Sequence, residues 1–259
     1  MTTNSNENNS SPSNLNSLIR KTSVKNKLLT MLQIQESLNQ RLNADWRKAN
    51  YKWRDAIMVE ATELFDHLPW KWWKVSAKNI DWGQVNLEAV DIWHFILSEA
   101  LQDGSEGAMG TLVERLTTTH LQMSAKPQEP IEVAYWTREL IRTAMAGDTH
   151  AGRLAVMTED FKCLLDSLGM SVEALYKLYV SKAKLNEFRW ANKYGTDYIK
   201  DWLGQEDNQY LTELIEKLDV DDELFADKIT EGLTARYEEV LAAKALEVEA
   251  YKERALEVL

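Results

Sequence analysis

The fold is decided by two similar stretches, Ala56-Ile57-Met58-Val59-Glu60-Ala61-Thr62-Glu63-Leu64-Phe65 and Leu87-Glu88-Ala89-Val90-Asp91-Ile92-Trp93-His94-Phe95. In both, apolar residues recur at the spacing of three and four that is typical of an amphipathic helix. The acidic pairs Glu60/Glu63 and Glu88/Asp91 lie three residues apart, on or beside the apolar stripe. Four carboxylates therefore stand where a helix would normally present apolar side chains to a core.

A bound metal ion is the simplest compensation for these acids. A buried carboxylate without a partner costs several kcal/mol or acquires a raised pKa. No basic residue falls on the same stripes. Ligands made only of oxygen favour Mg²⁺ or Mn²⁺ over zinc. The sequence thus predicts a four-carboxylate metal site between two antiparallel helices.

Two other interpretations of the acids are open. A single Glu-x-x-Glu in a helix is usually solvated, so only the combination of two pairs is informative. Asp91 and His94 have the acid-x-x-His spacing of di-iron bundles, but Glu60/Glu63 lacks the second histidine. We expect His67 and His94 to form supporting hydrogen bonds, because Mg²⁺ prefers oxygen ligands.

The composition favours an all-α helical bundle. The chain of 259 residues is 44% hydrophobic and holds few helix breakers, with 10 Gly and 4 Pro. Residues 1–22 are rich in Asn and Ser and are predicted to be a disordered polar tail. Residues 23–259 are predicted to form a single all-α catalytic domain. Within it, 103–170 is a candidate helical insertion and 221–259 a C-terminal helical extension.

Helix boundaries follow from the same periodicity. Helices are expected from about Ser23, over about 44–66, over about 84–102, after the N-cap residue Ser171 to about Trp190, and from about Asp221.

The net charge of -11 argues against a nucleic-acid or anionic-membrane partner. No apolar run approaches the length of a membrane span, and the first residues do not resemble a secretory signal. A single cysteine, Cys163, cannot form an internal disulfide. A cytoplasmic location is expected.

Several ordered blocks around the acidic pairs point to one family. Upstream stands Gln35-Glu-Ser-Leu-Asn39, and between the pairs stands Trp70-Lys-Trp-Trp-Lys74. Downstream stand residues 179–189, YVSKAKLNEFR, and 202–208, WLGQEDN. With the acidic pairs, these blocks resemble the dimeric, all-α dUTPases of the all-α NTP pyrophosphatase superfamily.

This resemblance implies hydrolysis of dUTP, and of dUDP, to dUMP with release of pyrophosphate from dUTP. It also implies Mg²⁺ dependence, with Mn²⁺ as a substitute, and a homodimer. The four carboxylates would hold the metal, which activates a water for attack on the phosphates. Glu63 or Glu60 could accept the proton of that water.

The resemblance also assigns substrate contacts. Gln35 and Asn39 share a stripe with Leu28 and Leu32. They would read the uracil edge, since an amide both donates and accepts hydrogen bonds. Trp70 or Trp73 would provide a stacking wall. The contacts expected on phosphate or sugar are Lys182, Asn186 and Arg189 on one helix face, together with Lys74, Tyr194, Lys200 and Asn208.

Two alternative functions stay open. One is a related pyrophosphohydrolase that prefers dCTP or another nucleotide. The other is a helical interaction protein without catalysis, in which the acids form salt bridges at an interface.

Overall fold

The chain is a helical protein throughout its described part. The computed structural model describes residues 12–73, 79–104, 106–120, 128–146, 150–220, 222 and 224–257. These ranges contain no strand, only one bridge between Asp201 and Glu206, so the all-α prediction is confirmed. None of the helices in these ranges is long and apolar enough to cross a membrane. The helices are α1 (Pro12–Leu42), the 3-10 helix η1 (Trp46–Lys48), α2 (Trp53–Asp66), α3 (Trp82–Asp103), α4 (Glu106–His120), α5 (Pro130–Met145), α6 (His150–Ser167), α7 (Val172–Ala191), α8 (Asp207–Glu216) and α9 (Phe225–Glu257).

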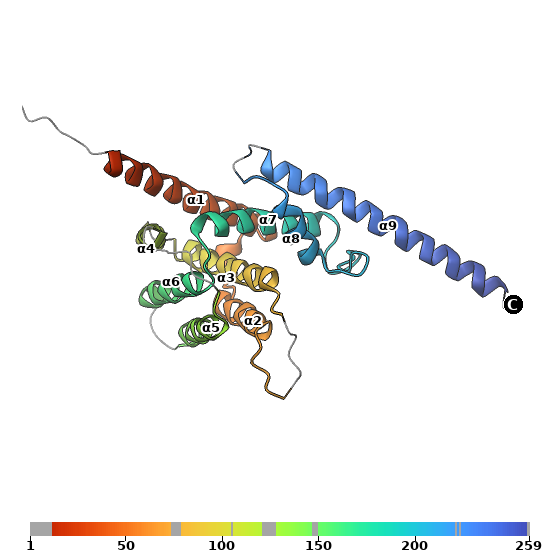
Figure 1. Ribbon diagram of the computed structural model, residues 1–259, viewed down its shortest axis with the longest axis horizontal. Coiled ribbons are helices and arrows are strands. Elements are labelled where there is room, and N and C mark those ends of the chain that lie inside the picture. Colours follow the sequence, from red (N-terminus) through yellow and green to blue (C-terminus); the bar gives the residue numbers. More distant parts are fainter. Residues whose placement is uncertain are drawn as a thin grey trace, which may run out of the picture.

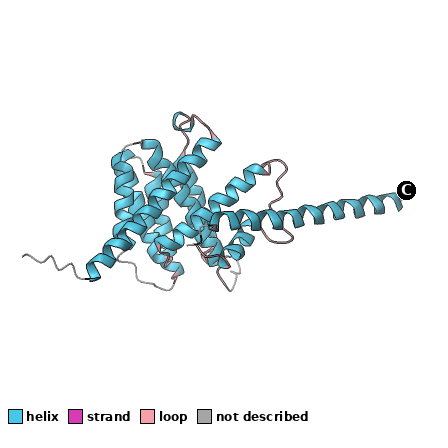
Figure 2. Ribbon diagram, turned by 90° about the horizontal axis from the view of Figure 1, so that it is seen from above, coloured by secondary structure: helices cyan, strands magenta, loops and turns pink. Residues whose placement is uncertain are grey.

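The helices pack as a bundle with one long projection. Helix α2 packs against α3 and α5, α5 packs against α6, and α1 lies along α7 (Figure 1). The first part of α9 packs on α7 and α8, and the rest extends away from the bundle, as both views show (Figure 2). Helix α3 contacts α1, α2, α6, α7 and α8, so it runs through the centre of the bundle.

Two hydrophobic clusters hold the bundle together. The larger one contains residues of every helix from α1 through α7. It includes the fully buried Trp93, whose ring stacks on Phe161 with centroids 5.1 Å apart. The smaller one joins α7, α8 and α9 around the fully buried Trp202. Leu87 of α3 belongs to the smaller cluster, and Val90 of the same helix belongs to the larger one. The acidic pair of α3 therefore lies at the junction of the two clusters.

Several helix boundaries differ from those predicted. Helix α1 is described from Pro12 onward, so it reaches into the segment expected to be a tail. The expected helix over 44–66 is two elements, separated at Asn50, whose positive φ of 50° breaks a helix. Helix α3 begins two residues early, at Trp82, because the Asp81 side chain caps it by accepting from the Gln84 backbone N–H.

The segment predicted as a candidate insertion is built into the bundle. Its helices α4, α5 and α6 contribute Leu116, Leu140 and Leu164 to the same cluster that holds α2 and α3. The division of the chain into a tail, a catalytic domain, an insertion and an extension stays a prediction.

Candidate functional site

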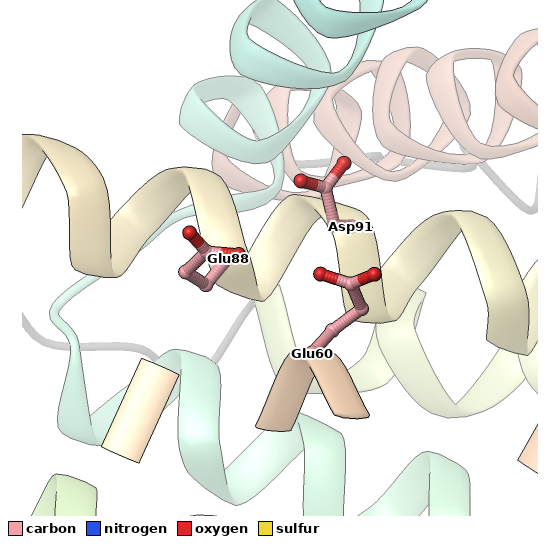
Figure 3. Close-up of side chains that lie close together, drawn as sticks. All are labelled: Glu60, Glu88 and Asp91. Atoms are coloured by element: carbon pink, nitrogen blue, oxygen red, sulfur yellow. The ribbon is translucent and has the colours of Figure 1, made fainter. Parts of the chain in front are cut away.

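Three carboxylates from two helices converge at the centre of the molecule. Glu60 of α2 points toward Asp91 of α3, and Glu88 lies one turn earlier on α3 (Figure 3). One oxygen from each lies within 4.8 Å of the others, which is close enough for one metal ion to bind all three. Glu88 is buried, while Glu60 and Asp91 are half-buried. All-oxygen ligands of this kind fit a hard divalent cation.

The fourth predicted carboxylate, Glu63, lies apart from this cluster. It is exposed, and its neighbour on the same side of α2, Val59, is 46% exposed. The prediction that Glu63 occupies a core position is therefore wrong, because this side of α2 opens onto a cavity. Glu63 lines that cavity together with the other three acids.

The cavity brings together residues that lie far apart in the sequence. It has a volume of about 620 Å³ and is bounded by α2, α3, α7, the segment before α8, and α8. On one side are Glu60, Glu63, Glu88 and Asp91 with His67, and on the other side are basic and polar side chains with one further acid, Glu206. That second group comprises Lys182, Arg189, Tyr194, Lys200, Glu206, Asn208 and Gln209.

Lys182 links the two sides of the cavity. Its Nζ lies 2.7 Å from Asp91 Oδ2 and donates a hydrogen bond of 3.0 Å to Asn208 Oδ1. The side chain is 3% exposed. Because no basic residue lies on the apolar stripes of the two acidic helices, the sequence suggested that the acids lack a basic partner. For Asp91 this inference is wrong, since Lys182 of α7 pairs with it.

Arg189 is held by a carboxylate that the sequence analysis did not single out. Its Nε and Nη2 donate to both oxygens of Asp207, at 2.8 and 2.7 Å, and Asp207 has no exposed surface. Tyr198 donates to the same carboxylate at 2.6 Å. Burial alone would raise the pKa of Asp207, but the hydrogen bonds and charge of Arg189 outweigh it and lower the pKa. The guanidinium also lies over the Tyr194 ring, 5.3 Å from its centroid.

One of the acids, Glu60, has a strongly raised pKa. Burial, followed by repulsion from Asp91 and Glu88, raises the pKa of Glu60 to about 8. His67 Nε2 lies 3.6 Å from Glu88 Oε1, and the nearby Glu88 carboxylate raises the pKa of His67. His67 therefore lies beside a candidate ligand, and its supporting role stays a prediction.

Gln35 and Asn39 lie in a buried polar network. Gln35 Nε2 donates to Asn39 Oδ1 and to Ser98 Oγ, both at 2.9 Å. Gln35 Oε1 accepts from the Tyr179 hydroxyl at 2.9 Å and contacts His94 Nδ1 at 2.7 Å. Neither amide is among the described residues that line the cavity. Ser98 and Tyr179 were given no role by the sequence analysis, because they face the amides only after α3 and α7 pack.

His94 belongs to this network and lies one turn after Asp91 on α3. Since Gln35 Oε1 can only accept, Nδ1 carries the proton and Nε2 is an acceptor. Within the described part of the chain, Nε2 is buried without a hydrogen-bond partner. Burial lowers the pKa of His94 to about 4, so the ring is neutral.

The remaining predicted contacts are more scattered. Trp70 and Trp73 are 37% and 54% exposed, and their rings meet edge to face at 5.3 Å. Asn186 accepts from Arg189 at 3.4 Å. None of these three is among the described residues lining the cavity. Lys74 lies outside the described residues.

Comparison with known proteins gives the family. Residues 27–194, well over half of the chain, match the family model described as dUTPase. A search of curated proteins found no match. The matched range contains both acidic pairs, the network around Gln35, and the cationic face of α7. The chain belongs to the all-α dUTPase family of nucleotide pyrophosphatases.

Proposed function

We propose that this protein hydrolyses dUTP, and also dUDP, to dUMP in a Mg²⁺-dependent reaction that releases pyrophosphate from dUTP. The observation that carries the proposal is the two-sided cavity, in which acids from α2 and α3 face cations from α7. A nucleoside triphosphate with its divalent ion needs both sides, because the acids suit the metal and the cations suit the phosphates. Membership of the dUTPase family supports the choice of nucleotide.

The acids divide into ligands and a proton acceptor. Glu60, Glu88 and Asp91 would hold the ion, since their oxygens converge within 4.8 Å. When bound, Mg²⁺ neutralises phosphate charge and lowers the pKa of a coordinated water. Glu63 is the better candidate for accepting the proton of the attacking water, because it borders the cavity without joining the cluster. Glu60 is the alternative.

The opposite side of the cavity would hold the phosphates and the sugar. Arg189 is fixed by Asp207, and Lys182 is fixed by Asn208, so both cations are positioned before substrate arrives. Lys200 and Tyr194 border the same space. Asn186, which touches Arg189, would suit the deoxyribose hydroxyl. Lys74 is proposed as a further phosphate contact.

The base would be read by the buried amides. Gln35 and Asn39 already contact each other and Ser98, so uracil must replace some of these hydrogen bonds. The acceptor Nε2 of His94 adds an unused polar atom beside them. Trp70 or Trp73, both partly exposed, would cover the base. Such a site rejects a nucleotide that leaves buried polar groups unpaired.

A nucleotide panel tests the proposal. With Mg²⁺, the wild-type protein should release pyrophosphate from dUTP faster than from dCTP, dTTP or UTP. Glu63→Gln should lower kcat by about 10²–10⁴-fold, the usual contribution of a general base, without unfolding the chain.

The matched control is Glu173→Gln, in the first turn of α7 and outside the residues that line the cavity. It should hydrolyse dUTP like the wild type. A preference for dCTP would replace the substrate assignment. Absence of pyrophosphate release from every nucleotide would favour the interaction protein.

The homodimer and the cytoplasmic location stay predictions. The first is supported by the family resemblance, and the second by the single cysteine. Sedimentation of the purified protein would test the dimer.

A further inference from the structure

The Lys182 ammonium is bound to one of the three carboxylates that would hold a metal ion. Its Nζ is 2.7 Å from Asp91 Oδ2, and an oxygen of Asp91 lies within 4.8 Å of oxygens of Glu60 and Glu88. Because only 3% of the Lys182 side chain is exposed, water can barely solvate its charge. The buried ammonium and the carboxylates therefore compensate each other.

A divalent ion on Asp91 would change this balance. Two cations held by one carboxylate repel each other, and the repulsion is weakly screened in a partly buried site. Lys182 has a second anchor, because Nζ also donates to Asn208 Oδ1 at 3.0 Å. The ammonium can thus leave Asp91 while it stays bound to α8 at the other side of the cavity.

We propose that Lys182 is the resident counter-cation of the carboxylate cluster, and that it competes with the divalent ion for Asp91 until a nucleotide phosphate gives it another anionic partner. The phosphate role rests on the proposed function. The competition itself rests only on the contacts of Lys182.

This competition couples metal and nucleotide. Free metal ion must displace an ammonium, so it binds weakly alone. A phosphate that attracts Lys182 removes the competitor, so nucleotide strengthens metal binding and, by linkage, metal strengthens nucleotide binding. Lys182 is thereby a positioning residue that favours loading of the site by the metal–nucleotide complex.

Mn²⁺ binding to the full chain without nucleotide tests the proposal, with free Mn²⁺ followed by electron paramagnetic resonance. Lys182→Gln keeps an amide that can donate to Asp91 and Asn208 but removes the charge. It should bind Mn²⁺ about tenfold more tightly than the wild type, as expected for the loss of one nearby cation. Lys182→Met should behave alike.

Lys184→Gln is the matched control. Lys184 lies on the same helix and pairs with Glu187 at 2.9 Å, so this variant makes the same charge change outside the cavity. Its Mn²⁺ affinity should equal that of the wild type. Equal or weaker Mn²⁺ binding by Lys182→Gln would overturn the proposal.

Stability gives a second readout if the variants fold poorly. Without Lys182 the carboxylates lose their counter-cation, so Lys182→Gln should melt below the wild type in chelator and regain stability with Mn²⁺. A variant that stays unfolded with saturating Mn²⁺ would make Lys182 a purely structural residue. Failure of the proposed function would look different from failure of this proposal. The wild type would then not hydrolyse dUTP, while Lys182→Gln would still bind Mn²⁺ more tightly than the wild type.

Discussion

Glu60 makes the metal-free protein sensitive to pH. Its pKa in the folded chain is about 8, because it is buried and faces Asp91 and Glu88, whereas the ordinary value is 4.5. Between these two values the folded state holds a proton that the unfolded state has released. The free energy of unfolding must therefore fall as the pH rises from about 5 to about 8.

Thermal denaturation in chelator tests this expectation. The melting temperature of the wild type should decrease between about pH 6 and pH 8 more than that of Glu60→Gln, whose amide mimics the protonated acid. Saturating Mg²⁺ should flatten the difference, because the bound ion takes the place of the proton. If the melting temperatures of the wild type and Glu60→Gln fall equally with pH in chelator, Glu60 is already ionised at neutral pH.

Asp207 is a residue whose loss should destabilise the chain. It is completely buried and receives two hydrogen bonds from Arg189 and one from Tyr198. Asp207→Asn leaves the Arg189 guanidinium buried without its counter-charge. We expect a loss of about 3–5 kcal/mol in the free energy of unfolding, measured with urea.

The same substitution at an exposed ion pair gives the control. Asp197 pairs with Lys193 at 3.0 Å, with 66% of its side chain exposed. Asp197→Asn should cost less than about 1 kcal/mol. If both variants lose the same free energy, the burial of Asp207 adds nothing to its ion pair.

Individual elements show where periodicity suffices and where it fails. The apolar stripes of α2 and α3 repeat over several turns, and the structure contains both helices, with their C-terminal ends near those expected. The break at Asn50 and the extension of α1 into the segment expected to be a tail both fall in polar stretches of the sequence. Such stretches carry no apolar repeat, so periodicity cannot locate these boundaries.

Helix α9 is one continuous element with two different environments. Its first half buries Phe225, Ile229, Leu233 and Val240 in the smaller hydrophobic cluster. Beyond this part it runs out of the bundle, and Leu246 is 72% exposed (Figures 1 and 2). Its contribution to stability should therefore come from the first half alone.

Urea denaturation of two variants separates the halves. Leu233→Ala should cost about 2–5 kcal/mol, since the residue is fully buried and leaves a cavity. A chain that ends after Leu246 should unfold at nearly the urea concentration of the full chain. A large loss in the shortened chain would mean that the projecting half packs against something in solution.

At the scale of the whole molecule, the site is an assembly that no local pattern encodes. Periodicity predicted the acidic pairs, and the family resemblance predicted Lys182 and Arg189. Neither could predict that Lys182 would touch Asp91, because that contact depends on how α7 crosses α3. Asp207 was missed for the same reason, since its partner Arg189 lies on another helix.

This assembly predicts how the molecule responds to a ligand. The cavity is bounded by α2, α3, α7 and α8, while α4, α5 and α6 contribute none of the described residues that line it. Mg²⁺ with a non-hydrolysable dUTP analogue should therefore slow amide hydrogen exchange in α2, α3, α7 and α8 together.

At a hundred times its Kd, the same ligand should also add about 2.7 kcal/mol to the free energy of unfolding. Glu88→Gln should weaken both effects, because Glu88 is the most buried of the three converging acids. Protection limited to α2 and α3 would place the nucleotide away from Lys182 and Arg189, and would contradict a site that needs both sides of the cavity.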